Sequence, residues 1–178
     1  RLLEKSVEGE NELGQLFDTH GQALKQNTML VDAEFYDGQF DRNNFINLYP
    51  FLPVHFDILL RLLGALAKST GGIGLRSAIK VVQDILIGGP LDEVEVLANK
   101  EIGYLANTVT LYNALERDIE RAFHSLYQSV EKVVLQFPDN LLIQDVAKTI
   151  TVLQILSHIP VTVANIAALM HSSIDQES

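Results

Sequence analysis

Apolar residues recur every three or four positions along most of this chain. That spacing lines one face of an α-helix, whereas a half-buried strand alternates apolar and polar residues. The helical spacing covers residues 10–25, 53–68, 75–87, 110–136 and 141–170. We therefore predict an all-α, mostly helical fold with at least five helices.

Turn and capping residues mark where some of these helices begin. Asp139 or Asn140 follows a Phe-Pro pair and can cap the helix that starts near Leu141, because a short polar side chain accepts hydrogen bonds from the free N–H groups there. Thr162 can cap a short last helix in the same way. The stretch 27–47 lacks helical spacing, so we predict an irregular segment with one short strand.

The apolar patterns also predict how three of the helices pack. Residues 53–68 are apolar around much of the helix, which indicates burial on more than one side. Residues 110–136 keep one stripe throughout, which predicts either one long amphipathic helix or two nearly continuous ones. In 75–87 a narrower stripe is expected to face the core, formed by Leu75, Ile79, Val82 and Leu86.

A break in the pattern divides the chain into three parts. A weak boundary lies near residues 88–107, which we interpret as a connector. The parts are an irregular and helical segment at 1–47, a helical pair at 48–90, and a long amphipathic helix with a helical hairpin at 91–178. The chain opens at Arg1 inside a helical pattern, without a start residue or a signal sequence, so we expect it to be a piece of a larger protein.

Composition is typical of a globular protein. Hydrophobic residues make up 47% of the chain. No apolar run reaches the roughly 20 residues that cross a bilayer. Cysteine is absent, which excludes disulfides and thiolate metal sites. We expect a cytoplasmic protein that does not bind membranes.

Charge is distributed unevenly along the chain. The net charge of −10 argues against a general nucleic-acid surface. Residues 58–88 nevertheless hold four basic residues and one acidic residue, +3 overall, between flanks of −6 and −7. Such a basic island could meet a phosphate group. A solvated helix face is the simpler interpretation of the charge alone.

Motifs that carry chemistry are missing from the chain. The glycines at 71–74 are not followed by the Lys-Ser or Lys-Thr pair of a phosphate-binding loop. The five histidines are widely separated and form no metal-spaced pair. No serine occupies a Gly-x-Ser-x-Gly elbow. We therefore expect no enzyme activity, catalytic residue, metal site or cofactor in the chain on its own.

Several stretches resemble a known family. Residues 44–53 (Asn-Phe-Ile-Asn-Leu-Tyr-Pro-Phe-Leu-Pro), 71–80 and 145–162 are similar to the large P-loop ATPases of bacterial phage-defence islands. These are the BREX-type and phage-growth-limitation ATPases and their uncharacterised relatives. The resemblance implies that this chain lies downstream of the nucleotide-binding core. It also implies an AAA+-like helical lid at 48–90, followed by a truncated winged-helix-like region.

The resemblance further implies a nucleotide-sensing residue. In AAA+-like ATPases, a lid helix that begins with Gly-x-x-Arg or a similar pattern brings its arginine to the nucleotide phosphates. Gly74-Leu75-Arg76 matches that form, so Arg76 is the candidate sensor. Lys80, one turn further on, either assists or only flanks it. A guanidinium near a helix N-terminus can hold phosphate through two hydrogen bonds. The other interpretation is that Arg76 lies on a solvated face.

The implied parent protein is an ATPase that uses ATP and Mg²⁺. Its lid and linker would couple the nucleotide state to partner contacts, and to DNA only through the parent. Partners would be the remainder of that chain, other phage-defence proteins and, in a homo-oligomer, further copies. The competing hypothesis is a nucleotide-independent helical scaffold or protein-interaction domain, which the acidity and the long amphipathic helix fit equally well.

Overall fold

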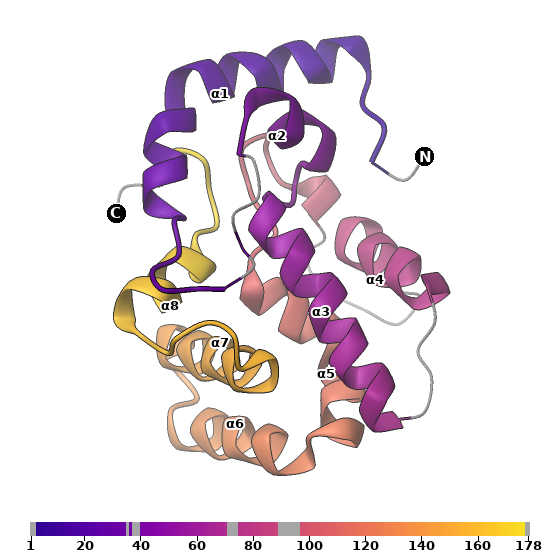
Figure 1. Ribbon diagram of the computed structural model, residues 1–178, viewed down its shortest axis with the longest axis vertical. Coiled ribbons are helices and arrows are strands. Elements are labelled where there is room, and N and C mark those ends of the chain that lie inside the picture. Colours follow the sequence, from indigo (N-terminus) through magenta and orange to yellow (C-terminus); the bar gives the residue numbers. More distant parts are fainter. Residues whose placement is uncertain (1–2, 35, 37–39, 71–74, 89–96, 177–178) are drawn as a thin grey trace.

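The chain folds into α-helices, as its hydrophobic spacing predicts (Figure 1). The computed structural model describes residues 3–34, 36, 40–70, 75–88 and 97–176. Its helices are α1 (Val7–Asn27), α2 (Arg42–Leu48), α3 (Pro53–Thr70), α4 (Leu75–Ile87), α5 (Thr108–Ala122), α6 (His124–Gln136), α7 (Leu141–Leu156) and α8 (Val163–Met170), with one short 3-10 helix, η1 (Leu97–Asn99). Among these residues β-type pairing is limited to two isolated bridges. In the same part of the chain, no helix has both the length and the apolar character needed to span a membrane.

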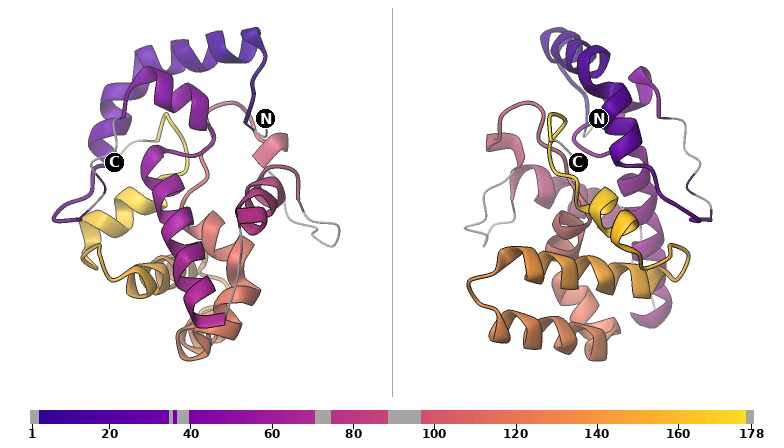
Figure 2. Two further views of the ribbon diagram at one scale, coloured as in Figure 1. Left: turned by 45° about the vertical axis from the view of Figure 1, so that its right-hand side comes forward. Right: turned by 90° about the vertical axis from the view of Figure 1, so that its left-hand side faces the viewer.

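Helix α5 lies at the centre of the packing. It contacts α3, α4, α6, α7 and α8. Helices α6 and α7 run side by side at one end of the molecule, and α1 packs on α2 at the other (Figure 1, Figure 2). The helices that follow residue 100 therefore share one framework with α3 and α4.

Apolar side chains of α3 and α5 are the largest contributors to the main core cluster. The buried apolar residues of α3 recur every three or four positions and line one broad face; they are Ile58, Leu59, Leu62, Leu63 and Leu66. Leu60 of the same helix is 45% exposed, so the prediction that α3 is buried on more than one side is wrong. The same cluster includes Leu111, Tyr112, Leu115 and Ile119 of α5 and Val152, Leu153 and Leu156 of α7. A smaller cluster joins α1 to α2. Burying an aliphatic side chain of this size stabilises the fold by about 1.5–3 kcal/mol, so α3 and α5 account for much of its stability.

The structure corrects two further expectations drawn from the spacing of apolar residues. Residues 27–47, predicted to be irregular with a short strand, contain α2, which is capped by Asp41 accepting a hydrogen bond from the Asn44 N–H at 2.8 Å. A helix of 7 residues is too short for its periodicity to be visible. Ile79, placed on the core stripe, is exposed. Val82 is buried as predicted, and Val81 and Ile85 are buried beside it. Leu86 is half-buried, and the side chain of Leu75 lies outside the described residues.

The long amphipathic stretch 110–136 is two helices, the second of the two predicted alternatives. The backbone of Phe123 (φ −134°, ψ 50°) leaves the helical region between α5 and α6. The predicted caps are confirmed at both later helices. Asn140 accepts a hydrogen bond from the Ile143 N–H at 3.1 Å, and Thr162 accepts one from an N–H of α8 at 3.2 Å.

Two buried asparagines tie distant segments together. Asn107 caps α5, and its Nδ2 donates to the Met170 carbonyl oxygen at 2.9 Å. Asn165 in α8 is fully buried and accepts a hydrogen bond from the Val31 N–H at 2.8 Å. Its Nδ2 donates to the carbonyl oxygens of Val31 and Pro160, each at 3.0 Å. These bonds hold the segment after α1 against α8.

Asn165→Ala should lower the free energy of unfolding by about 2–3 kcal/mol. The substitution removes the bonds to Val31 and Pro160 and leaves the amide and carbonyl of Val31 without these partners. Urea denaturation followed by circular dichroism measures the change. Gln154→Ala, at an exposed position of α7, is the control and should have little effect. A loss below about 0.5 kcal/mol for Asn165→Ala would contradict this role.

His55 of α3 is buried beneath the end of α8. Its Nε2 lies 3.1 Å from the Leu169 carbonyl oxygen, which can only accept, so Nε2 carries the proton. Its Nδ1 has no hydrogen-bond partner among the described residues. Burial lowers the pKa of His55 to about 4; the bond to Leu169 opposes this shift and the charge on His171 adds to it. His55 is therefore neutral in the folded protein at neutral pH.

Folding stability should fall as the pH drops from 7.5 to 5. The unfolded chain takes up a proton on His55 near pH 6.5, whereas the folded chain resists protonation until about pH 4, so acid favours unfolding. The loss due to His55 is about 2 kcal/mol at pH 5. Urea denaturation at the two pH values measures it. His55→Gln, which does not titrate, should lose correspondingly less; an equal pH dependence in that variant would refute the assignment.

Candidate functional site

The residues predicted to sense nucleotide belong to α4. The helix begins at Leu75, as expected, which places Arg76 in its first turn. The side chain of Arg76 and the glycines at 71–74 lie outside the described residues. Lys80, one turn further on, is exposed. Since α4 buries its opposite face against α3 and α5, Lys80 is available to a group approaching from solvent.

Other cations of the basic island have different surroundings. The guanidinium of Arg61 on α3 lies 5.4 Å from the centre of the Tyr36 ring, a cation–π arrangement. Lys68, near the end of α3, is exposed. The neighbouring Ser69 hydroxyl donates to the Ala122 carbonyl oxygen at 3.1 Å and so ties the end of α3 to the end of α5. Arg61 therefore has a packing role, while Lys68 and Lys80 face solvent.

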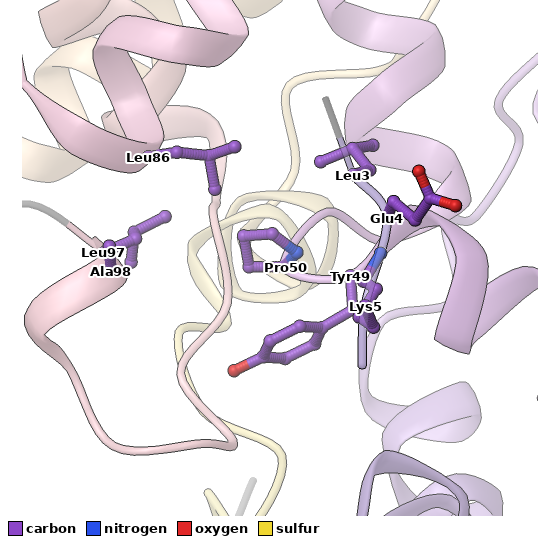
Figure 3. Close-up of a pocket in the computed structure, with 8 residues that line it drawn as sticks. All are labelled: Leu3, Glu4, Lys5, Tyr49, Pro50, Leu86, Leu97 and Ala98. Atoms are coloured by element: carbon purple, nitrogen blue, oxygen red, sulfur yellow. The ribbon is translucent and has the colours of Figure 1, made fainter. Parts of the chain in front are cut away.

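A mostly apolar hollow of about 210 Å³ opens between the N-terminal segment and α4 (Figure 3). Leu86 and Leu97 point toward the space from one side and Leu3 from the other, with Pro50 between them. The remaining lining residues are Glu4, Lys5, Tyr49 and Ala98. We name this feature the Lys5 hollow. A cavity of ~150 Å³ holds a benzene ring, so this one has room for an aliphatic side chain.

The hollow has one basic and one acidic lining residue, Lys5 and Glu4. The Nζ of Lys5 donates to the Asn47 carbonyl oxygen at 2.9 Å. Burial lowers the pKa of Lys5 to about 8, an effect that the charge on Glu10 partly opposes. The ammonium is thus partly desolvated, and a further carboxylate placed beside it would stabilise the charged form. The mostly apolar lining therefore suits an apolar group.

A second hollow, also of about 210 Å³, has a polar lining that includes His20, Glu101, Ser173 and Asp175. The Ser173 hydroxyl donates to the Asp175 carboxylate, and this bond lowers the pKa of Asp175. A serine that donates to a carboxylate and not to an imidazole is not activated as a nucleophile. Among the residues that the structure describes, no three His, Asp or Glu side chains are placed to hold a metal ion.

Exposed apolar side chains gather at the turn between α6 and α7. Every residue from 135 to 143 is exposed. The large apolar ones are Leu135, Phe137, Leu141, Leu142 and Ile143. Leu135 is 80% exposed, Leu141 70% and Leu142 66%. We name residues 135–143 the α6–α7 tip. Single exposed leucines are common on soluble proteins, whereas several within one short turn make that turn a candidate binding surface.

Hydrogen bonds hold the backbone of this tip. The buried side chain of Gln144 donates from Nε2 to the carbonyl oxygens of Phe137 and Pro138, at 2.8 and 3.1 Å. The Asn140 N–H also donates to the Phe137 carbonyl oxygen, at 3.2 Å, while its side chain caps α7. Because the turn is fixed in this way, the tip presents its apolar side chains in one arrangement, which lowers the entropic cost of binding.

The apolar spacing does not predict this surface. It predicts a helix that starts near Leu141 and assigns no role to the apolar residues beside it. The signal was present, however. Leu141, Leu142 and Ile143 are successive apolar residues in the first turn of a helix. Successive helical residues point about 100° apart, so all three cannot face the same core.

The candidate sites are therefore the first turn of α4, the Lys5 hollow and the α6–α7 tip. The first could meet an anion, the second an apolar group, and the third an apolar concave surface. The chain matches no protein-family model, no characterised protein and no solved structure. These sites and the resemblance in sequence are therefore the evidence for function.

Proposed function

We propose that this chain is the lid and linker of a large P-loop ATPase of the phage-defence type, and that it couples the nucleotide state to contacts made by its distal helices. The proposal rests on the resemblance of residues 44–53, 71–80 and 145–162 to that family. The observation that supports it best is the position of α5, which contacts the α3–α4 pair as well as α6, α7 and α8.

The packing around α5 supplies a physical route for such coupling. Leu111, Leu115 and Ile119 belong to one apolar cluster with side chains of α3, α4 and α7. Protein cores are close-packed, so a shift of the α3–α4 pair either moves α5 with it or opens a void. A void of leucine size costs about 2–5 kcal/mol. Moving as a unit is therefore the easier response, and the α6–α7 tip would follow.

Arg76 and Lys80 would meet the nucleotide in this arrangement. From the first turn of α4, a guanidinium can bind two phosphate oxygens next to the free backbone N–H groups of the helix. Lys80 would add a second positive charge one turn away. ATP and Mg²⁺ would be held by the nucleotide-binding core of the parent protein, where Mg²⁺ neutralises charge that develops on the phosphates.

Arg76→Ala in the intact parent protein should lower ATPase activity or ATP-dependent assembly roughly ten-fold or more. Losing one charge-assisted phosphate contact removes about 1.5–3 kcal/mol of binding free energy, and about 1.4 kcal/mol corresponds to a factor of ten. Steady-state ATP hydrolysis and nucleotide affinity are the measurements. Arg117→Ala, which removes an exposed arginine of α5, is the matched control. Wild-type affinity, turnover and assembly in Arg76→Ala would exclude the sensor role.

The isolated chain should neither hydrolyse ATP nor bind it with micromolar affinity. It lacks the phosphate-binding loop and the metal-holding carboxylate that a P-loop site needs. Isothermal titration calorimetry with Mg·ATP measures this directly. Micromolar binding by the chain alone would show that it contains a nucleotide site of its own and would overturn its assignment as a lid.

The second candidate is a nucleotide-independent protein-interaction domain. The exposed α6–α7 tip favours it, because such a surface binds without any nucleotide. The upstream sequence of the parent protein separates the two functions. A phosphate-binding loop there supports the lid, whereas an upstream region without one leaves the interaction domain.

A further inference from the structure

Two buried histidines lie where the end of α8 meets α3. His55 of α3 is fully buried, and His171, which follows α8, is only 3% exposed. The Nε2 of His55 donates to the carbonyl oxygen of Leu169 at 3.1 Å, two residues before His171. The charge on His171 lowers the pKa of His55, so the two rings are close enough to act on each other. One joint between helices therefore contains two titratable rings.

Protonation of either ring is unfavourable in this position. The Nδ1 of His55 and the Nε2 of His171 are buried, and neither has a hydrogen-bond partner among the described residues. A proton on the Nδ1 of His55 adds a buried charge together with an N–H that has no acceptor. Burial lowers the pKa of His171 too, and a hydrogen bond to the Ser173 backbone opposes that shift. Both rings are therefore neutral at neutral pH.

No buried charge balances a proton on either ring. In the part of the chain that the structure describes, no Asp, Glu, Lys or Arg side chain is buried. Helix α8 has no charged residue, and the charge that acts on His55 is that of His171, which repels a second positive charge. Near His171, Glu101 and Asp175 are exposed. The half-buried charged side chains on α3, on the helices that contact it and on residues 97–107 are Asp57, Arg61, Asp84, Lys100, Glu116, Asp118, Asp145 and Lys148.

We propose that residues 168–174 form an acid-operated latch: protonation of His55 and His171 releases the last turn of α8 and the segment after it from α3 and α5. We name these residues the α8 latch. In the open state water solvates both rings, so each takes up a proton near the ordinary pKa of histidine, about 6.5. The closed state resists protonation of His55 until about pH 4. Acid therefore favours the open state, and the latch loosens as the pH falls from about 6.5 towards 4.

Few contacts besides the His55 bond hold the α8 latch closed. Three hydrogen bonds, each of 2.9 Å, join it to residues 103–107. Leu169 belongs to the main core cluster and Ile174 to the smaller one, and the other members of both clusters lie outside the latch. Opening therefore exposes much less apolar surface than unfolding of the core does. Proteins open first in such segments, at a lower free energy than global unfolding.

Cysteine accessibility tests the latch, because the chain has no cysteine of its own. Ala168→Cys, at a position that is 3% exposed, reports on the last turn of α8, and Val152→Cys, at a fully buried position of α7, reports on the core. Gln154→Cys, at an exposed position of α7, gives the reaction rate of an accessible thiol at each pH. A dipyridyl disulfide is the reagent, since its good leaving group lets it label thiols at pH 5 as well as at pH 7.5.

The labelling rate of Ala168→Cys, relative to that of Gln154→Cys, should rise roughly ten-fold or more from pH 7.5 to pH 5. Opening moves the pKa of His55 from about 4 to about 6.5, and this shift alone accounts for such a rise. At pH 5, Val152→Cys should be labelled roughly ten times more slowly than Ala168→Cys, or slower still, because its exposure requires the core to unfold.

Histidine variants assign the rise to the latch. With His55→Gln and His171→Gln together, neither ring titrates, and Ala168→Cys should lose its pH dependence. His124→Gln removes an exposed histidine at the start of α6 and is the matched control, which should keep the full rise. If the double variant does not fold, the ring proton resonances of the wild-type chain replace it. Those of His55 and His171 should then titrate in step with the labelling of Ala168→Cys.

Three results would overturn the proposal. The first is a labelling rate of Ala168→Cys that does not change with pH. The second is equal labelling of Ala168→Cys and Val152→Cys at pH 5, which would show that the segment opens only when the whole chain unfolds. The third is an unchanged rise in the double variant, or ring resonances that titrate while Ala168→Cys stays protected. Because no nucleotide is present, failure here leaves the proposed role of Arg76 untouched.

Discussion

The packing of α5 among its neighbours is the constraint on which the rest of this structure depends. The fully exposed residues of the helix form a polar stripe of Asn113, Arg117, Glu120 and Arg121, and the opposite face is buried. Both ends of the helix are fixed to other helices by hydrogen bonds between side chain and backbone. Asn107 joins its start to the end of α8, and Ser69 joins its last turn to the end of α3. Movement of the surrounding helices therefore requires α5 to move relative to α3 and α7.

The helices at the centre of the molecule are tightly packed, whereas the candidate binding residues lie outside that core. The α6–α7 tip, the Lys5 hollow and the first turn of α4 all lie at helix ends or turns, where the core does not dictate the side chains. Each is nevertheless supported by the framework: Gln144 fixes the tip, and Asn47 binds the ammonium of Lys5. Binding residues placed on turns but anchored to a helical core can have any chemistry without disturbing the fold.

Sequence periodicity was sufficient to predict most of the helices but not the candidate binding surfaces. The predicted range of the fourth helix matches Leu75–Ile87, because glycines on both sides end its pattern. The prediction failed at α2, where one or two turns produce no measurable period, and at Ile79, where three nearby apolar residues competed for the core. Lys5 could not be found in this way, and the α6–α7 tip left only the run of three apolar residues that begins at Leu141. A hollow is formed by residues that are distant in sequence. The sequence also does not distinguish an exposed apolar residue from a buried one.

The bonds between Asn165 and Val31 join positions 134 residues apart in the chain. Contacts of such large sequence separation slow folding, because a long loop must close before they can form. During synthesis the segment after α1 can reach none of these partners until residue 165 has left the ribosome. The helical core around α3, α5 and α7 consists of shorter-range contacts and can assemble earlier. Docking of the segment after α1 onto α8 is thus expected to be a late step, whereas α1 can pack on α2 earlier because those helices are close in sequence.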